Sequence, residues 1–503
     1  MWSARAARWC SIALVLAVIA GIVVRLHTTS DLWLDEALTV NISRLPLKDL
    51  FQHLRHDGHP PLYYVLLHFW MTAFGGSDNA VRSLSGIFSI LTIPPLVVIA
   101  RRIGGKVTAT AALLLIATSP FAVRYATETR MYSLVMLLVT LGWLAMHWAM
   151  DRPTLKRLAP VALLSGALAL THYWSLYLLL ALGIMLLLKW RRGDPAALKV
   201  ALALAAGGVL FVPWLPTFLY QSGHTGTPWG LPDRPTSVIT IMFTDWGGGP
   251  NGEAQFLGVG LFLLMVLAVT ARGIDSWRLE LDLRTRPGVR TETVVAAMTL
   301  AVAMWIAYWT HSAFAPRYTA VLLPIVLLVC AFGVAVFVDE RIRALILVVF
   351  AVFGLVNGVR IDRAQRTQGG FIGRYISAQG DPGDVVAFCP DQLGPATMRS
   401  LADGRKTVTF PDAGDPHFVN WVDYEKRNKN GDPVAFAKML HDTAGAHTVW
   451  IVEQPGYRTF GTKCEKLVDA EKALRPGAAV VESGATFEHM FLYQFGPGHL
   501  KQS

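Results

Sequence analysis

The sequence predicts a mainly α-helical membrane protein, in which a polytopic bundle of about eleven spans is followed by an α/β domain. Three observations lead to this fold class. The composition is apolar, with 53% hydrophobic and only 16% charged residues, whereas a soluble chain carries about 25% charged residues. Apolar runs recur from residue 8 to residue 359. Residues 361–503 are more polar and contain many Gly, Pro and Asp.

The net charge of +10 does not indicate a nucleic-acid partner. Much of the charge lies in short loops between apolar runs, where basic residues orient a membrane protein. The 16 tryptophans suit anchoring at the membrane interfaces. We therefore expect membrane lipid as a partner and no nucleic acid.

A membrane-spanning helix needs roughly 20 apolar residues. Eleven segments are candidates: 8–25, 79–100, 106–121, 129–150, 158–171, 173–190, 198–216, 255–271, 291–310, 317–338 and 341–359. In the first segment, an apolar run from Cys10 to Val24 follows Arg5 and Arg8, as the core of a secretory signal would. No convincing small-residue cleavage site precedes Arg25, so we interpret this run as an uncleaved first span.

Basic residues test the direction of each span, because cytoplasmic loops carry an excess of Lys and Arg. With the N-terminus in the cytoplasm, every predicted inside loop is basic. These loops carry Arg101, Arg102 and Lys106; Arg152, Lys156 and Arg157; Lys189, Arg191, Arg192 and Lys199; Arg272, Arg278, Arg284, Arg286 and Arg290; and Arg341 and Arg343. The odd number of spans then places the C-terminal part outside the plasma membrane.

Residues 60–75 look like a further span, but counting them as one would invert every later loop. At 16 residues with His68 inside, the segment better fits a helix lying in the interface. The chain is thereby divided into a transmembrane domain, residues 1–360, with an outer catalytic loop at 26–78, and an extracytoplasmic α/β domain, residues 361–503.

Short apolar runs in this last part predict strands near 384–388, 448–452 and 490–493, and residues 433–440 predict a helix. Cys389 and Cys464 could form one disulfide outside the cytoplasm. Sequence alone does not establish that pairing.

Asp35 and Glu36 directly follow the first span, where uncompensated carboxylates are expensive. One carboxylate could act as a base while its neighbour is held by an arginine or a metal. The simpler interpretation is a helix N-terminus, which also favours acidic residues.

Asp57 and His59 precede Pro60 and Pro61, so His59 would be rigidly presented. A histidine there could donate to a phosphate, bind a metal or assist proton transfer. Alternatively, the segment is only a turn before the interfacial helix, with His59 in solvent.

Further polar residues fall at the outer ends of spans. Tyr125, Glu128 and Arg130 precede one span, and Arg suits phosphate through paired hydrogen bonds. They could instead form a structural Glu–Arg pair, or the arginine could reach the membrane surface. Arg317 and Tyr318 begin a late span, against the positive-inside trend. Arg82 and His172 complete the candidates.

Other donor chemistries have no support in the sequence. We find no glycine-rich phosphate loop and no Cys-x-x-Cys or His-Glu-x-x-His metal motif. Nucleotide-sugar or ATP binding is therefore not indicated, and a donor delivered within the membrane fits better.

Taken in order, these residues resemble the GT-C membrane glycosyltransferases. In particular, they resemble the family 39-like branch, which holds the protein O-mannosyltransferases and the lipid A aminoarabinose transferase. The matching pieces are Leu34-Asp35-Glu36, His59-Pro60-Pro61-Leu62, Arg82, the segment from Tyr125 to Leu134, and Pro316-Arg317-Tyr318. They cover roughly residues 8–340, and the C-terminal domain lies outside the resemblance.

The resemblance implies inverting transfer of a sugar, mannose or a pentose, from a polyprenyl-phosphate donor on the outer face of the membrane. The acceptor would be a cell-envelope glycan, lipid or protein. Asp35 and Glu36 would be the catalytic pair, and Arg130 and Arg317 would bind the leaving phosphate. His59, Arg82, Tyr125, Glu128, His172 and Tyr318 would complete the substrate site. Some members use a divalent metal such as Mg²⁺ or Mn²⁺ and others do not, and the sequence leaves this open.

Three alternatives remain. A transporter or flippase for a lipid-linked glycan would place charges midway along its spans and show repeated halves. A scaffold whose outer domain binds a partner would tolerate loss of Asp35. A third alternative is a GT-C reaction of another kind, such as oligosaccharide transfer to protein.

Overall fold

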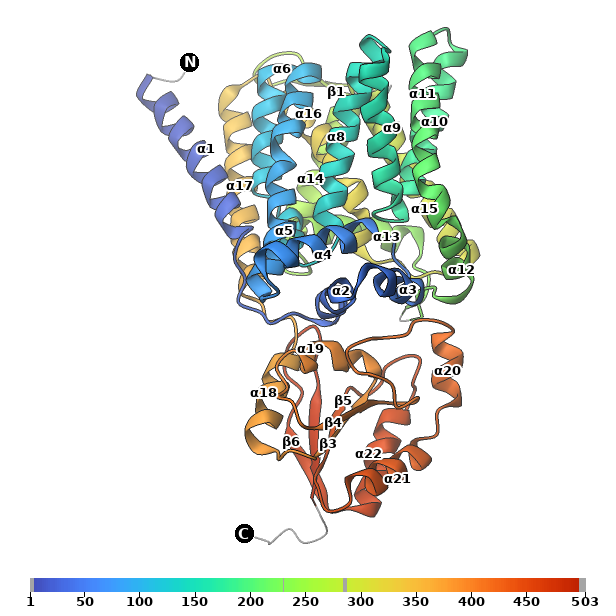
Figure 1. The fold of residues 1–503 in the computed structure, drawn as a ribbon. Helices are drawn as coiled ribbons and strands as arrows, with labels where there is room; N and C mark the ends of the chain where they lie inside the picture. Colours follow the sequence, from blue (N-terminus) through green and yellow to red (C-terminus); the bar gives the residue numbers. More distant parts are fainter. Residues whose placement is uncertain (1–3, 229, 284–286, 497–503) are drawn as a thin grey trace.

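A computed structural model describes residues 4–228, 230–283 and 287–496 of the chain. Figure 1 shows a long bundle of helices and, beyond one of its ends, a smaller region built on a sheet. The predicted fold class is confirmed, because the chain is mostly helical with a small C-terminal sheet domain.

The bundle is built from apolar helices that run between its two ends (Figure 1). They are α1 (Ala4–Val24), α5 (Asp78–Leu91), α6 (Ile93–Ala117), α8 (Tyr132–Asp151), α9 (Leu155–Ala169), α10 (Trp174–Arg191), α11 (Pro195–Gly207), η1 (Gly208–Trp214), α12 (Leu215–His224), α14 (Gly252–Thr270), α15 (Pro287–Thr310), α16 (Leu323–Ala335) and α17 (Glu340–Arg363). Among the described residues, seven helical stretches are long and apolar enough to cross a membrane. The chain is therefore a multi-pass membrane protein.

Each of the eleven predicted spans overlaps one or more of these helices. Length and composition alone identify seven spanning stretches among the described residues. The stretch Asp78–Ala117 overlaps two of the predicted spans. It is broken at Gly105, whose φ of 78° suits glycine, so the predicted spans 79–100 and 106–121 lie on either side of the break.

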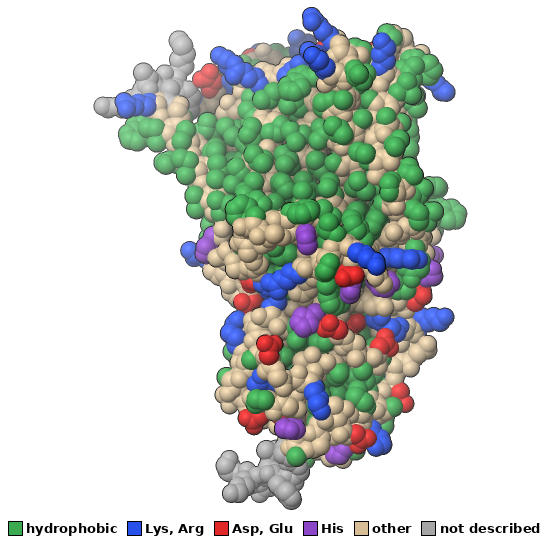
Figure 2. Space-filling view, viewed as in Figure 1, with side chains coloured by type: hydrophobic (Ala, Val, Ile, Leu, Met, Phe, Trp, Pro, Cys, Tyr) green, Lys and Arg blue, Asp and Glu red, His purple; other side chains and the backbone are tan. Residues whose placement is uncertain are grey.

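Figure 2 shows a broad hydrophobic band around the bundle, with charged side chains gathered at both ends. Lys and Arg side chains crowd the end far from the sheet, where α10 turns into α11 (Figures 1 and 2). The basic loops that set the predicted topology fit this end of the bundle. Arg284 and Arg286 lie outside the described residues.

The opposite end is closed by short helices. They are α2 (Leu34–Arg44), α3 (Leu47–Asp57), α4 (Leu62–Phe74), α7 (Pro120–Ala126), α13 (Pro235–Gly247) and η2 (Pro316–Val321). The predicted outer loop 26–78 is therefore largely helical. Helix α4 buries Tyr63, Tyr64 and Leu67 and lies across the end of the bundle (Figure 1), in agreement with a helix that does not span.

The C-terminal sheet has the strand order β4-β3-β5-β7-β6. Strand β3 (Val385–Cys389) pairs in parallel with β4 (Lys406–Thr409) and β5 (Val449–Glu453), while β7 (Phe491–Phe495) is antiparallel to β5 and β6 (Gly477–Val481). Strands β3 and β5 are buried along their whole length, which explains their continuous apolar runs. A separate two-stranded ribbon joins β1 (Ala271–Gly273) to β2 (Leu279–Leu281).

The strands are accompanied by α18 (Gly369–Gln379), η3 (Asp391–Leu393), α19 (Gly394–Met398), α20 (Tyr424–Asn430), α21 (Pro433–Ala444) and α22 (Lys463–Leu474). The three predicted strands and the predicted helix are confirmed. A disulfide joins Cys389 at the end of β3 to Cys464 in α22.

The division into residues 1–360 and 361–503 stays a prediction, and α17 continues past it to Arg363. The two parts touch through backbone groups. Trp421 N–H donates to the His56 carbonyl at 3.1 Å, and Asp423 N–H donates to the His224 carbonyl at 2.8 Å. The sheet region is thereby docked against the end of the bundle that carries the short helices.

Candidate functional site

The first turn of α2 points its two acidic side chains in different directions. Glu36 is fully buried, and Arg82 binds it twice, with Nε 2.7 Å from Oε1 and Nη2 2.6 Å from Oε2. The Thr129 N–H also donates to Glu36 at 2.9 Å. Burial acts to raise the pKa of Glu36, but Arg82 outweighs it and holds the pKa below its usual value. Glu36 is thus a charged anchor inside the protein.

Arg82 is also engaged on its other side, where Nη1 donates to the Ser30 carbonyl at 2.6 Å. A second arginine, Arg366, lies 3.6 Å from Glu36 and donates to the carbonyl and hydroxyl of Thr127 at 2.6 and 2.7 Å. Burial lowers the pKa of Arg366 to about 9. These contacts tie the start of α2 to the segment that follows α7.

Asp35 differs from its neighbour in having no partner at close range. Its carboxylate lies 3.9 Å from Nη2 of Arg130 and 3.8 Å from Nη2 of Arg317, both longer than a direct hydrogen bond. The Asp35 side chain is 15% exposed. The two guanidinium groups therefore flank an acid that remains accessible.

Arg130 is held in place by hydrogen bonds to neighbouring side chains. It donates to Thr39 Oγ1 at 2.8 Å and to His59 Nε2 at 3.0 Å. His59 Nδ1 lies 2.8 Å from Asp57, which also accepts a hydrogen bond from the Tyr64 hydroxyl at 2.7 Å. Burial opposes the ionisation of Asp57, but His59 and Arg130 hold its pKa below the usual value. His59 therefore accepts from Arg130 through Nε2 and donates to Asp57 through Nδ1.

Glu128 and Asp245 are two further acidic residues of this region. Glu128 is buried and pairs with Arg124 at 3.1 Å, and burial raises its pKa. Asp245, near the end of α13, faces Arg124 and Arg317, and burial raises its pKa to about 6. Sequence reasoning missed Asp245, although an acid at the end of an apolar helix is itself a signal.

Aromatic rings line the same region. The His172 ring lies 5.7 Å from that of Tyr132 and 5.4 Å from that of Tyr318, and the Tyr125 and Tyr132 rings are 4.8 Å apart. Burial, together with the charges of Arg130 and Arg317, lowers the pKa of His172, which is therefore neutral. The flanking rings and the flanking charges together suit a polar ring compound that carries a negative group.

The sequence-predicted residues thus come together at one end of the bundle, from segments far apart in the chain. Sequence reasoning did not find Arg366. An arginine just after the last span could have been flagged by the argument that singled out Arg317.

A metal does not fit the side chains around Asp35. Within the described ranges, no three His, Cys, Asp or Glu side chains lie together as metal ligands. The carboxylate of the adjacent residue, Glu36, is already bound by Arg82. We derive no step through a metal.

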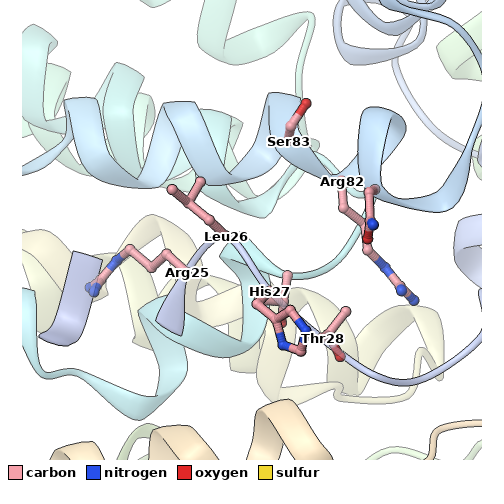
Figure 3. Close-up of a pocket in the computed structure, with 8 residues that line it drawn as sticks. Arg25, Leu26, His27, Thr28, Arg82 and Ser83 are labelled. Carbon is pink, nitrogen blue, oxygen red and sulfur yellow. The ribbon is translucent and has the colours of Figure 1, made fainter. Parts of the chain in front are cut away.

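A separate small hollow lies next to α1 and α5, lined in part by Arg25, His27 and Arg82 (Figure 3). The guanidinium groups of Arg25 and Arg82 point in opposite directions in this view. Arg25 donates to the carbonyls of Ile116 and Ala117, which closes the end of α6. Asp35 does not line this hollow.

Comparisons with known proteins agree with the resemblance predicted from the motifs. The model of the dolichyl-phosphate-mannose-protein mannosyltransferase family matches residues 58–216. No curated protein sequence matches the chain.

Solved structures extend the likeness to nearly the whole chain. ArnT from Cupriavidus metallidurans in the apo state has a TM-score of 0.61 and 12% identity, covering 98% of this chain and 98% of that chain. ArnT bound to undecaprenyl phosphate has a TM-score of 0.61 and 13% identity, covering 97% and 98%. The chain therefore has an ArnT-like fold, and the predicted resemblance is confirmed.

Proposed function

We propose that this protein is a membrane glycosyltransferase that moves one sugar from a polyprenyl-phosphate donor to an acceptor hydroxyl, with inversion at the anomeric carbon. One observation supports this most strongly. Asp35 is accessible between Arg130 and Arg317, while its neighbour Glu36 is locked by Arg82. The ArnT-like fold supports the same reaction class, because one of the similar structures holds undecaprenyl phosphate.

In this mechanism Asp35 accepts the proton of the acceptor hydroxyl. The hydroxyl oxygen forms a bond to the anomeric carbon as the bond from that carbon to the phosphate oxygen breaks. The electron pair leaves with the polyprenyl phosphate. Arg130 and Arg317 stabilise the negative charge that develops on the phosphate, since both point towards the region beside Asp35.

The remaining residues receive supporting roles. Glu36 and Arg82 hold the first turn of α2, because the Arg82 donors are used within the protein. His59 orients Arg130 rather than touching the donor, since both of its ring nitrogens are engaged. Tyr125, Glu128, His172 and Tyr318 line the space for the sugar.

The orientation that fits this reaction places Asp35 and the C-terminal sheet outside the plasma membrane. Positive charge at the opposite end of the bundle supports this choice (Figure 2). The donor sugar would be mannose or a pentose, and the acceptor a glycan, lipid or protein of the cell envelope. A transporter fits less well, because these charges gather at one end of the bundle and not midway along it.

The test is sugar transfer by the purified full-length protein in detergent. Synthetic polyprenyl-phosphate mannose and pentose serve as donors, and membranes from a deletion strain serve as the acceptor source. We expect transfer from one of the donors and none from Asp35→Asn, while Asp49→Asn on the neighbouring α3 remains active. Lipid extracts of the deletion strain should contain more of the unused donor, or a glycan that lacks one residue. No transfer from either donor, together with unchanged lipid extracts, would contradict the proposal.

A further inference from the structure

The ribbon of β1 and β2 lies between α14 and α15 in the chain, at the end of the bundle far from the C-terminal sheet (Figure 1). Its strands are antiparallel, and the pairing continues one step further, where the Asp282 N–H donates to the Thr270 carbonyl at 2.7 Å. Asp275 closes the turn by accepting from the N–H groups of Trp277 and Arg278 at 2.8 and 3.0 Å. The ribbon is therefore an ordered element with a defined register.

The register gives the ribbon two chemically different faces. Residues that are paired across antiparallel strands point to the same face, whereas successive residues point to opposite faces. One face is apolar and consists of Ala271, Gly273, Leu279 and Leu281, with Leu283 next in the alternation. The other face is polar and carries Arg272, Glu280 and Asp282. The ribbon is thus amphipathic.

The β1 half of the apolar face lies against the bundle. Ala271 is fully buried. A Cβ atom at Gly273 would lie 2.3 Å from the carbonyl oxygen of Val336, so β1 lies directly on the segment between α16 and α17. The side of the ribbon that faces the bundle is therefore the side that carries the leucines.

The β2 half of the same face is not covered by the described part of the chain. Leu281 is 66% exposed and Leu283 is 90% exposed. Trp277, at the turn, is 86% exposed. A contiguous exposed group of large apolar side chains marks a contact surface. Because β1 lies on the bundle, the leucines of β2 continue its apolar face sideways and meet whatever surrounds the bundle at that level.

The position of the ribbon indicates what surrounds it. Strand β1 begins directly after α14 ends at Thr270, so the ribbon lies where the hydrophobic band of the bundle gives way to the Lys and Arg side chains (Figure 2). Lipid headgroups meet acyl chains at this level, and Trp is enriched there. An element with an apolar face towards the acyl chains and a polar face towards water is stable in that layer.

The backbone of β2 limits how deeply the ribbon can lie. Among the described residues, β2 pairs with β1 alone, so its second edge keeps N–H and carbonyl groups that need partners. Hydrocarbon supplies none, whereas headgroups and water do. The ribbon therefore suits the headgroup layer and not the interior of the membrane.

We propose that the β1–β2 ribbon is a lipid-surface anchor, whose leucine face and Trp277 lie in the headgroup layer of the leaflet at the basic end of the bundle. The helix that follows it has the least protein around it. Among the seven apolar stretches of the described residues, the one in α15 is the least buried, at 17%. An anchor next to α15 would hold the end of a helix that is otherwise mostly surrounded by lipid. This inference is independent of the proposed function.

The test places a small fluorophore on either face of β2 in the full-length protein. Leu281→Cys and Glu280→Cys are neighbours on opposite faces, and both native side chains are exposed. The background is Cys10→Ser, because Cys10 is exposed while the remaining cysteines are buried or paired. Each labelled protein is placed in nanodiscs of phosphatidylcholine and phosphatidylglycerol, with or without bromine on the acyl chains near the headgroup.

The two labels should respond to opposite quenchers. We expect brominated lipid to quench the label at 281 strongly and the label at 280 little, and iodide in the water to do the reverse, because the two side chains point to opposite faces. Leu283→Cys should repeat the result at a second position on the apolar face.

Three outcomes would overturn the proposal. If iodide quenches both labels and brominated lipid quenches neither, the ribbon stands in water. If the label at 281 resists both quenchers, the leucine face is covered by protein, either a second copy of this chain or another partner. If brominated lipid quenches both labels equally, the ribbon has no lipid-facing side, and the amphipathic arrangement is wrong.

Discussion

Asp35 and Glu36 are adjacent, yet their surroundings give them opposite properties. Glu36 is enclosed by Arg82, Arg366 and the Thr129 N–H. Its carboxylate is therefore fully engaged by partners within the protein that hold α2 in place. Asp35 keeps its carboxylate near Arg130 and Arg317 without a close bond to either. A side chain that is charged, accessible and flanked by cations suits a base next to a departing phosphate.

The first prediction concerns Asp35 itself. Asp35→Asn keeps the shape of the side chain and removes its charge, and general-base catalysis contributes about 10²- to 10⁴-fold. We expect at least a 100-fold fall in turnover, with folding and donor binding close to normal. Transfer from the synthetic polyprenyl-phosphate sugar measures it. Near-normal turnover in Asp35→Asn, with an inactive Glu36→Gln, would reassign the base to Glu36.

The second prediction concerns Glu36, whose loss should act on stability. Glu36→Gln leaves Arg82 and Arg366 buried with their main counter-charge removed, and breaking a buried pair costs about 3–5 kcal/mol. Thermal unfolding in detergent should show a clearly lower midpoint. Glu253→Gln is the control, because the Glu253–Arg360 pair is about half exposed and exposed pairs contribute little to stability. Equal midpoints for the two variants would contradict the anchoring role.

The third prediction separates charge from geometry at the proposed phosphate ligands. Lysine keeps the charge of Arg130 and Arg317 but loses the planar fork that suits phosphate. We expect both Arg→Lys variants to bind polyprenyl phosphate more weakly and to turn over more slowly. Arg374→Lys, at an exposed pair with Asp31, should behave as the wild type. Normal donor binding and turnover in Arg317→Ala would remove Arg317 from the site.

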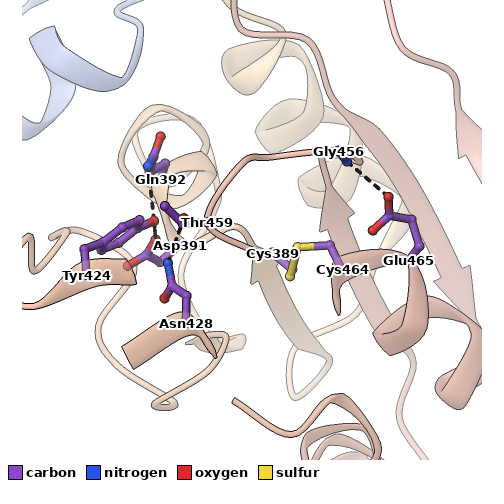
Figure 4. Close-up of a disulfide and its surroundings, with 9 residues drawn as sticks. All are labelled: Cys389, Asp391, Gln392, Tyr424, Asn428, Gly456, Thr459, Cys464 and Glu465. Carbon is purple, nitrogen blue, oxygen red and sulfur yellow. Dashed lines mark hydrogen bonds between the residues drawn. A yellow bond between two sulfur atoms is a disulfide. The ribbon is translucent and has the colours of Figure 1, made fainter. Parts of the chain in front are cut away.

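At the scale of elements, a disulfide and a buried titratable acid, Asp391, lie at the junction between β3 and α22. Figure 4 shows the disulfide between Cys389 and Cys464 close to the group formed by Asp391, Gln392 and Tyr424. The Tyr424 hydroxyl donates to Asp391, and Arg427 lies 3.1 Å from the same carboxylate. The two features can be tested separately.

The disulfide links positions that are 75 residues apart. On the chain-entropy model, closing a loop of this length stabilises the folded state by about 4 kcal/mol. A Cys389→Ser/Cys464→Ser double variant should therefore unfold at a lower temperature in the C-terminal part. In the unreduced wild type, an alkylating reagent should label neither cysteine. Ready labelling of both would contradict the pairing.

The titration of Asp391 should make stability depend on pH. Burial raises its pKa to about 6, with Arg427 opposing the shift, whereas an unfolded aspartate titrates near 3.9. Because the folded state binds the proton more tightly, the stabilisation is complete below pH 4 and is lost as the pH rises through about 6. A shift of this size corresponds to a few kcal/mol, at about 1.4 kcal/mol per unit. Asp391→Asn should flatten this part of the unfolding profile between pH 4 and 7, and an unchanged slope would exclude Asp391 as its source.

At the scale of the whole molecule, the bundle separates two chemically different ends. One end carries the basic turns, and the other carries the short helices, the acidic and aromatic site and the sheet (Figures 1 and 2). This separation suits the proposed reaction on a lipid-linked donor, in which the apolar bundle would hold the lipid and the charged end would hold the reacting groups. By the positive-inside trend, this charge asymmetry predicts that the basic end faces the cytoplasm.

Reporter fusions test this orientation. Fusions at residue 280, in β2, and after residue 365, beyond α17, should report opposite sides of the membrane, with residue 280 in the cytoplasm. The distribution of basic loops is the physical reason. If both fusions report the cytoplasm, Asp35 would no longer be placed outside and the proposed donor could not be used there.

The sequence by itself determined the class of fold and the positions of the main elements. The hydrocarbon core of a membrane requires long apolar helices, so the spans could be found from composition. The side on which the basic loops lie could be predicted because cytoplasmic loops carry an excess of Lys and Arg. The strands β3 and β5 were visible because central strands are apolar throughout. Asp35, Arg130 and Arg317 could be selected because charges beside apolar runs are conspicuous.

Only the tertiary structure decided which of these residues meet and which partners surround each one. The different surroundings of Asp35 and Glu36 depend on Arg82 and Arg366, which lie 46 and 330 positions beyond Glu36. Asp245 lies at the end of an apolar helix, but nothing in the sequence shows that it faces Arg124 and Arg317. The physical reason is that burial and charge pairing are properties of the folded neighbourhood, and folding brings together segments whose separation along the chain carries no information about their contact.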